Sequence, residues 1–146
     1  MGVNRAGDGP LLILLVEDNP GDVRLVSEAL GRRGDPVAEL EVVEDGEEAL
    51  ERVRASDRSR PDIVMLDLNL PRKDGRGVLR ELKRDPDLRR IPVIVFTSSA
   101  TERDMLDCYD LHANCYVVKP IVLDDPMSTV EDVVRFWLHT TLLPPR

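Results

Sequence analysis

The stretch LLILLVEDNPGDVRLVSEALGRR, residues 11–33, sets a pattern that the rest of the chain repeats. Its first six residues, 11–16, are an unbroken apolar run, which is typical of a strand buried on both faces. The run ends at the acidic pair Glu17 and Asp18, and apolar residues return at helical spacing over residues 21–33. We therefore expect a buried strand, a polar turn and an amphipathic helix.

Four more pairs of this kind follow along the chain. Further strands are expected at 38–43, 63–66, 91–96 and 115–118, and further helices at 47–55, 75–84, 102–111 and 125–139. Asp125 is the expected N-cap of the last helix, with Pro126 in its first turn. Buried strands that alternate with amphipathic helices predict a parallel sheet covered on both faces. Five units are too few for an eight-stranded barrel, which leaves a doubly wound α/β sheet.

Length and composition limit the class of protein. The 146 residues predict one domain over residues 11–141, with a loose leader at 1–10 and a short tail at 142–146. A net charge of −8 disfavours binding to nucleic acid. The longest apolar run is too short to cross a membrane, and it lacks the flanks of a secretion signal. We therefore expect a cytoplasmic protein with no membrane or nucleic-acid partner, whose two cysteines are reduced.

Polar residues follow four of the expected strands. Glu17 and Asp18 end the first strand, Asp67 ends the third, Thr97 ends the fourth and Lys119 ends the fifth. Ligands of open α/β sheets bind beyond the carboxyl ends of the strands. These side chains, which are far apart in the sequence, are therefore expected to meet at one site.

The chemistry of that site follows from its charges. Glu17, Asp18 and Asp67 would crowd three carboxylates together, and two like charges about 4 Å apart repel by about 4 kcal/mol at an effective dielectric near 20. A hard divalent cation relieves this repulsion, and Mg²⁺ suits oxygen ligands. A nucleophilic carboxylate, a metal, a hydroxyl and an ammonium are the groups needed for transfer of a phosphoryl group to aspartate.

Four stretches together resemble the response-regulator receiver family. They are LLVEDNPGDVRLV (14–26), PDIVMLDLNLPRKDG (61–75), VIVFTSSATERD (93–104) and NCYVVKP (114–120). The resemblance covers roughly residues 11–138 and implies the CheY-like, flavodoxin-like (βα)5 fold with strand order 2-1-3-4-5. It also implies a phosphorelay switch that receives its phosphoryl group from a sensor histidine kinase.

The resemblance assigns roles at the metal site. Asp67 is the implied phosphoacceptor, and Glu17 and Asp18 are the acidic pair that binds Mg²⁺ together with Asp67. Asn69, two residues after the acceptor, is expected to offer its backbone carbonyl to the metal. Asn19 is the better N-cap for the following helix, which leaves Asp18 for the metal.

The resemblance also assigns the switch. Thr97 is the implied switch hydroxyl, Lys119 the phosphate-contacting lysine and Tyr116 the switch aromatic residue. Phosphorylation is expected to pull Thr97 toward the phosphate and to let Tyr116 turn inward. In this family the bond between Lys119 and Pro120 is usually cis.

A finer resemblance concerns the second half of the chain. YDLHANCYVVKP (109–120) and EDVVRFWLHTTLLP (131–144) are similar to the small stand-alone regulators paired with bacterial phytochrome histidine kinases. His112 departs from the commoner pattern, since a glycine often stands at this turn and positive φ is unfavourable for other residues.

Two other functions remain open from the sequence. One is a Mg²⁺-dependent phosphatase that forms an aspartyl phosphate, although such enzymes usually carry a second acid where this chain has Asn69. The other is a degenerate, constitutively binding receiver, which would be expected to lack the acceptor, an acid or the lysine.

The last expected helix suggests how the domain signals. An apolar stripe at core-facing spacing runs along it, and Phe136, Leu142 and Leu143 lie off or beyond that stripe. Surplus apolar residues suggest a partner surface. In the family, the face made by the fourth helix, fifth strand and fifth helix is a common dimer site. We therefore expect output by protein contact, through a homodimer whose interface includes Phe136.

Overall fold

The structure, a computed structural model, describes residues 10–31, 38–120 and 125–146. The leader expected at residues 1–10 thus lies almost wholly outside the described residues. Five strands form one parallel sheet in the order β2-β1-β3-β4-β5, as predicted. The strands are β1 (Leu11–Val16), β2 (Ala38–Val43), β3 (Ile63–Leu66), β4 (Val93–Thr97) and β5 (Cys115–Val118).

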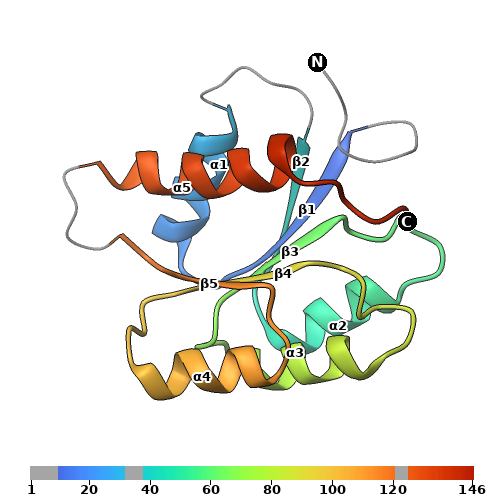
Figure 1. Cartoon of the computed structure of the whole chain (residues 1–146). Coiled ribbons are helices and arrows are strands. Elements are labelled where there is room, and N and C mark those ends of the chain that lie inside the picture. The colour runs from blue at the N-terminus through green and yellow to red at the C-terminus, as the bar shows by residue number, and fades with distance from the viewer. Residues whose placement is uncertain (1–9, 32–37, 121–124) are drawn as a thin grey trace.

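Helices cover both faces of the sheet. They are α1 (Pro20–Gly31), α2 (Gly46–Arg54), α3 (Gly75–Arg84), α4 (Glu102–Asp110) and α5 (Pro126–Arg135), which continues as the π-helical turn η1 (Phe136–Thr140). α1 and α5 lie on one face, and α2, α3 and α4 lie on the other (Figure 1). None of the helices within the described residues is long and apolar enough to span a bilayer.

Side-chain alternation along the strands divides the core between the two faces. In β1, Leu11, Ile13 and Leu15 pack toward α1 and α5, whereas Leu14 and Val16 pack toward α2, α3 and α4. All six residues of β1 are buried. The unbroken apolar run is therefore explained by a strand that has helices on both sides.

Short polar side chains begin each helix. Asn19 accepts the N–H groups of Gly21 and Asp22 at 2.9 and 3.1 Å, and Asp125 accepts that of Ser128 at 3.2 Å, as predicted for both caps. Because Asn19 caps α1, the carboxylate of Asp18 is left for the site. The remaining helices are capped by Asp45, Asp74 and Thr101.

Three details differ from the sequence-based expectations or sharpen them. β4 was expected at 91–96 but begins at Val93, because Pro92 has no N–H for a strand ladder. It ends one residue later than expected, at Thr97. The peptide bond between Lys119 and Pro120, expected to be cis, is trans, which is the lower-energy isomer of most such bonds by about 0.5–1 kcal/mol. His112 has a φ of 71°, so it occupies the conformation that glycine usually takes at this turn.

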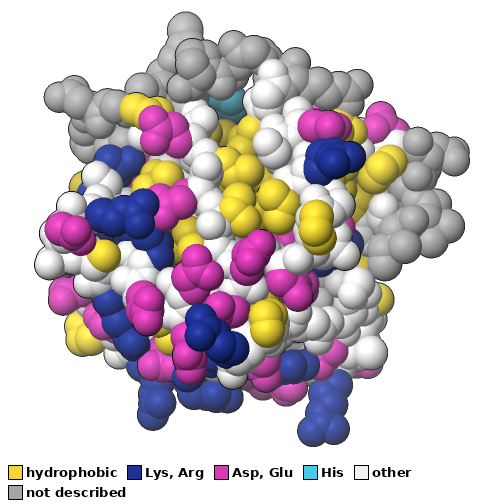
Figure 2. All heavy atoms as spheres, turned by 180° about the vertical axis from the view of Figure 1, so that it is seen from behind, with side chains coloured by type: hydrophobic (Ala, Val, Ile, Leu, Met, Phe, Trp, Pro, Cys, Tyr) yellow, Lys and Arg dark blue, Asp and Glu magenta, His cyan; other side chains and the backbone are white. Residues whose placement is uncertain are grey.

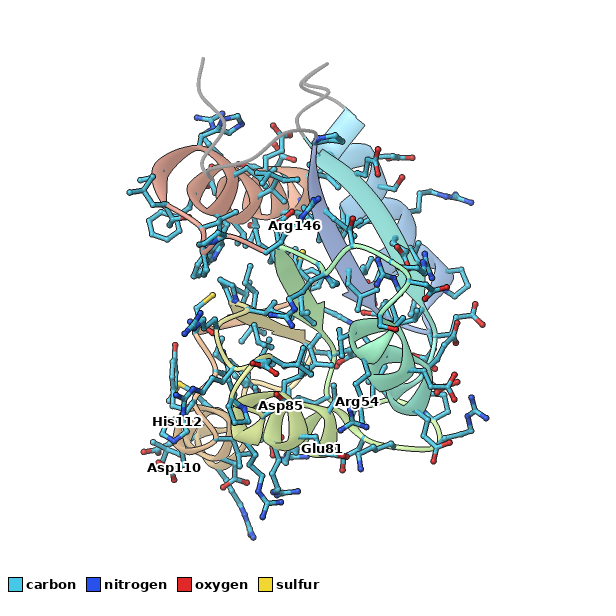
Figure 3. The ribbon with its side chains drawn as sticks, turned by 90° about the vertical axis from the view of Figure 1, so that its right-hand side faces the viewer. Arg54, Glu81, Asp85, Asp110, His112 and Arg146 are labelled. Atoms are coloured by element: carbon cyan, nitrogen blue, oxygen red, sulfur yellow. The ribbon has the colours of Figure 1, made fainter. Side chains whose placement is uncertain are left out.

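The residues after η1 pack on the domain. Leu143 is buried in the core under α1 and α5, so it is not the surplus apolar residue that the sequence suggested. The guanidinium of Arg146 (labelled in Figure 3) pairs at 2.9 Å with Asp62, the residue before the central strand β3. Phe136 and Leu142 stay exposed, as expected for residues off the core stripe. The predicted domain boundary after residue 141 stays a prediction.

Candidate metal centre and acceptor carboxylate

The acidic residues at the ends of β1 and β3 meet, as their positions in the sequence predict. The N–H of Asp67 donates to the carbonyl of Val16 at 3.1 Å, which aligns the residues that follow these two strands. One carboxylate oxygen each from Glu17, Asp18 and Asp67 lies within 4.8 Å of the others. Glu17 and Asp67 are buried and Asp18 is exposed. An oxygen-rich cluster with one open side fits a divalent cation that keeps some of its waters.

The loop after β3 fixes the carboxylate of Asp67. Its Oδ1 accepts the N–H of Leu68 at 2.7 Å and that of Asn69 at 3.4 Å. The loop folds back so that the N–H of Gly75 donates to the carbonyl of Leu68 at 2.9 Å. A Cβ at Gly75 would lie 2.2 Å from the carbonyl oxygen of Asp67, so only glycine allows this approach. The structure places Asn69 beside the acidic cluster, but its carbonyl as a metal ligand stays a prediction.

Lys119 is the cation of the site. Its Nζ donates to Asp67 Oδ2 at 3.1 Å and lies 2.8 Å from Glu17 Oε1, and its side chain is 8% exposed. The same Nζ donates to Asp22 Oδ2 at 2.8 Å. Three carboxylates therefore surround one ammonium.

Burial and charge set the protonation of this cluster. Burial raises the pKa of Glu17 to about 7, and the nearby charge of Asp67 adds to the rise while Lys119 opposes it. Burial alone would lower the pKa of Lys119. The hydrogen bonds to Asp22 and Glu17 and the charges of Glu17 and Asp67 outweigh burial and raise the pKa of Lys119 above its ordinary value. The lysine is therefore a permanent cation, and Glu17 is protonated more easily than an ordinary glutamate.

The predicted switch residues meet at the loop after β4. Thr97 is fully buried, and its hydroxyl accepts the N–H of Ser99 at 3.4 Å. The hydroxyl of Tyr116 donates to the carbonyl of Ser99 at 2.8 Å, and its ring packs against the core beneath α2, α3 and α4. The ring of Tyr116 is thus partly buried and its hydroxyl is tied to the loop after β4, while its movement on phosphorylation stays a prediction.

A polar network ties this loop to two helices. The Ser99 hydroxyl donates to Asp104 of α4 at 2.5 Å, and Arg76 of α3 pairs with the same carboxylate. The hydrogen bond from Ser99 is the chief cause that lowers the pKa of Asp104 below its ordinary value, and Arg76 adds to it. The loop that follows Thr97 is therefore anchored on both α3 and α4.

Asp22, Gly75 and the Arg76–Asp104 pair were not found by sequence reasoning. The Asp74-Gly75 pair was a visible turn signal. Asp22 stands in the first turn of the helix that follows the acidic pair, near the same end of the sheet, which was the one available sign. Its contact with Lys119 joins residues 97 positions apart, and local patterns do not reveal such contacts.

Taken together, an open parallel sheet with three acids, a buried lysine and a hydroxyl at its carboxyl edge defines a phosphoacceptor class of signalling domain. The model of the response regulator receiver domain matches residues 13–131, and the chain belongs to this family.

Relatives of known structure agree with this membership. The chain is 45% identical over 139 residues to Response regulator Rcp1 of Synechocystis, covering 92% of this chain and 94% of the relative. The phosphorylated cyanobacterial phytochrome response regulator RcpA superposes with a TM-score of 0.88 at 45% identity, over 94% of this chain and 100% of the other. The Mn²⁺-bound form of Rcp1 gives a TM-score of 0.86 at 44% identity, over 93% and 100%.

Proposed function

We propose that this receiver accepts a phosphoryl group on Asp67 from a sensor histidine kinase and signals through contact with other proteins. The observation that carries the proposal is the buried Asp67 carboxylate, which has Lys119 on one oxygen and Glu17 and Asp18 beside it. In the transfer, an oxygen of Asp67 forms the new bond to phosphorus while the bond from phosphorus to the donor breaks. Lys119 is the cation placed to hold the phosphoryl oxygens.

We propose Mg²⁺ as the cofactor. Glu17, Asp18 and Asp67 would hold it, with the backbone carbonyl of Asn69 as a further ligand. When bound, the ion supplies positive charge that offsets the crowded carboxylates and the phosphoryl oxygens. The acidic cluster of this structure and the Mn²⁺-bound relative support a divalent cation here.

We propose that Thr97 and Tyr116 carry the signal away from the site. Thr97 lies at the end of β4, and its hydroxyl and the hydroxyl of Tyr116 both bind the backbone of Ser99. A movement of Thr97 toward a phosphoryl group would break or shift these contacts. The Tyr116 position and the loop to α4 would then change together, which alters the surface made by α4 and β5.

The test of the acceptor is Asp67→Asn. With acetyl phosphate and Mg²⁺, we expect the wild-type protein to gain one acid-labile phosphoryl group, seen by intact mass, and the variant to gain none. The asparagine is nearly isosteric and removes one charge from a repelling cluster, so the fold should keep its thermal stability without metal. Uptake by the variant at the wild-type rate would show that the acceptor is another residue. Continuous turnover of many equivalents by the wild type would favour a phosphatase instead of a switch.

We further propose a phytochrome-type histidine kinase as the partner. The support is the 45% identity to Rcp1 over nearly the whole of both chains, together with RcpA, which is a cyanobacterial phytochrome response regulator. A cytoplasmic location fits both this partner and the free thiols of Cys108 and Cys115, since disulfides are rare in the cytosol.

A homodimer through the face of α4, β5 and α5 is the proposed output. Large apolar side chains are exposed along this face: Leu106 (49%), Tyr109 (45%), Val118 (41%) and Phe136 (51%). The Phe136 and Trp137 rings of η1 meet edge-to-face, with centroids 5.6 Å apart. A two-fold contact would bury the same patch of both copies.

Sedimentation of the wild type and of Phe136→Asp, with and without phosphorylation, tests the dimer. We expect the wild type to dimerise at tens of micromolar, with phosphorylation changing the dissociation constant. The variant should remain a monomer because it would bury a charge at the interface. Wild-type protein that sediments as a monomer in every state would show that this face serves a different partner.

A further inference from the structure

Asp22 lies close to the site but outside the acidic cluster. Asn19 caps α1 by accepting the N–H groups of Gly21 and Asp22, and this fixes the first turn of the helix. From that turn the carboxylate of Asp22 reaches Lys119 at the end of β5, with an Nζ to Oδ2 distance of 2.8 Å. The Asp22 side chain is 26% exposed and that of Lys119 is 8% exposed, so this ion pair is partly shielded from water.

The ammonium of Lys119 lies among three carboxylates. It carries three N–H groups and no acceptor. Asp22 and Glu17 lie 2.8 Å from Nζ, and Asp67 lies 3.1 Å from it. The carboxylates of Asp22 and Asp67 each accept one of these N–H groups, so a phosphoryl oxygen that draws the ammonium toward itself has to weaken the hydrogen bond to Asp22.

The three carboxylates differ in what releases them. Glu17 and Asp67 belong to the cluster that would engage a divalent cation, and Asp67 is the proposed acceptor itself. Asp22 is outside that cluster, so neither the metal nor the new phosphoryl bond engages its oxygens. Asp22 is therefore the carboxylate that still binds Lys119 when the metal and the phosphoryl group are present.

We propose that Asp22 is a positioning residue that competes with the phosphoryl oxygens for the ammonium of Lys119. This proposal rests on the proposed function of Asp67. In the resting protein Asp22 draws the ammonium toward α1 and adds a negative charge that faces the incoming phosphoryl group. Both effects slow phosphoryl uptake, and both weaken the hold on a bound phosphoryl group. Asp22 therefore slows the phosphorylation of Asp67 by any donor that does not displace the Asp22 carboxylate from Lys119.

The kinetic test uses Asp22→Ala with acetyl phosphate at saturating Mg²⁺. In this reaction the bond from phosphorus to the acetyl oxygen breaks, acetate leaves and the bond to Asp67 forms. We expect Asp22→Ala to take up the phosphoryl group roughly threefold to tenfold faster than the wild type, the range that follows from one charge-assisted hydrogen bond in a partly exposed site. Affinity for fluoroberyllate, a phosphoryl mimic, should rise by a similar factor.

Two controls separate this role from a general effect of charge. Glu28→Gln removes the same charge from an exposed position further along α1 and should leave the rate within twofold of the wild type. In a Lys119→Ala background, Asp22→Ala should give a smaller increase than in the wild type, because competition for the ammonium is gone and only the repulsion between the Asp22 charge and the phosphoryl group is left to relieve. Equal or slower uptake by Asp22→Ala, or the same gain from Glu28→Gln, would overturn the proposal.

A second measurement does not depend on phosphorylation. In metal-free wild-type protein, the Nζ protons of Lys119 should exchange slowly enough to be seen by NMR, since three carboxylates surround them. Asp22→Ala should shift this signal and speed the exchange, whereas Glu28→Gln should not. An unchanged signal in Asp22→Ala would show that Asp22 does not position Lys119. If instead the wild type fails to take a phosphoryl group on Asp67, the proposed function fails, and the NMR result still decides the position of the lysine.

Discussion

Glu17 shows how the fold and the site place opposing demands on one residue. Its N–H extends the sheet by donating to the carbonyl of Val43 at 3.0 Å, and this buries its side chain beside Asp67. Burial raises the pKa of Glu17 to about 7, although Lys119 lies 2.8 Å away. The ionised carboxylate that a metal needs is therefore a cost to the metal-free fold.

This cost predicts a pH-dependent effect of Glu17→Gln in metal-free protein. The folded pKa of about 7 lies above the ordinary value of 4.5, so the penalty is absent below pH 4.5, grows as the pH rises toward 7 and is complete above it. Above pH 7 the variant should gain roughly 3 kcal/mol of unfolding free energy, and near pH 4 it should gain nothing. Urea denaturation in a chelator between pH 4 and 8.5 measures this difference.

The control for this experiment is Glu28→Gln, which changes an exposed acid of α1 and should alter the stability little at any pH. A gain from Glu17→Gln that is the same at pH 4 and pH 8 would contradict the assigned pKa. At pH 8, Mg²⁺ should make the wild type more stable than Glu17→Gln, because Mg²⁺ stabilises the wild type by mass action and stabilises Glu17→Gln less.

At the scale of elements, the connection from β3 to α3 positions the acceptor. Asp74 caps α3, and the N–H of Gly75 donates to the carbonyl of Leu68, which brings the helix start against the backbone of Asp67. A Cβ at position 75 would meet the backbone of Asp67, whereas a Cβ at position 77 would meet the flexible side chain of Lys73. The backbone therefore requires glycine at position 75 but not at position 77.

The pair Gly75→Ala and Gly77→Ala tests this difference. Alanine at position 75 would place its Cβ 2.2 Å from the carbonyl oxygen of Asp67, so the loop must shift. We expect a loss of about 2–4 kcal/mol in unfolding free energy and weaker Mg²⁺ binding. Alanine at position 77 should raise stability by about 0.5–1 kcal/mol, because it restricts the unfolded chain and suits a helix. Equal effects of the two substitutions on metal binding would show that Gly75 has no special role.

The sequence predicted the individual elements better than the side-chain contacts between them. The bounds of β1, β2, β3 and β5 were predicted correctly because apolar runs and their polar ends are local signals. The meeting of Glu17, Asp18, Asp67 and Lys119 followed from a rule about where parallel strands end. Contacts between side chains of different elements, such as Ser99 with Asp104, depend on packing angles that no local pattern contains.

At the scale of the whole molecule, the two ends of the described chain are joined at the amino-terminal end of the strands. Asp62, just before β3, is almost wholly buried, and its carboxylate accepts the N–H of Leu12 at 2.7 Å. Arg146 donates to both oxygens of this carboxylate and also to the carbonyl of Pro10 at 3.0 Å. Asp62 directly precedes the central strand β3 and Asp67 directly follows it, so this contact lies at the opposite end of the strands from the acidic site (Figure 3).

The surface at this scale is mixed in charge. On the face that includes the edge strand β2, acidic and basic side chains are interspersed, and apolar side chains gather in one area among them (Figure 2). Ion pairs between elements contribute to the pattern, such as Arg54 of α2 with Glu81 of α3 at 3.0 Å, which face each other in Figure 3. Exposed pairs of this kind add little stability individually, about 0–1 kcal/mol. The Arg146–Asp62 pair differs because its carboxylate is buried.

Arg146→Met should therefore cost more than the loss of a surface ion pair. Removal of the guanidinium takes away the hydrogen bonds that Arg146 donates to both oxygens of the buried Asp62 carboxylate, and we expect a loss of about 1–3 kcal/mol in unfolding free energy. In an Asp62→Asn background the same substitution should cost at least about 1 kcal/mol less, because the amide needs no cation and still accepts the N–H of Leu12. Urea denaturation of the four proteins gives the coupling free energy. Additive costs would show that Arg146 stabilises the domain only through its contact with Pro10 and its packing. Phosphoryl uptake should be unchanged in all four, since the pair lies at the opposite end of the strands from Asp67.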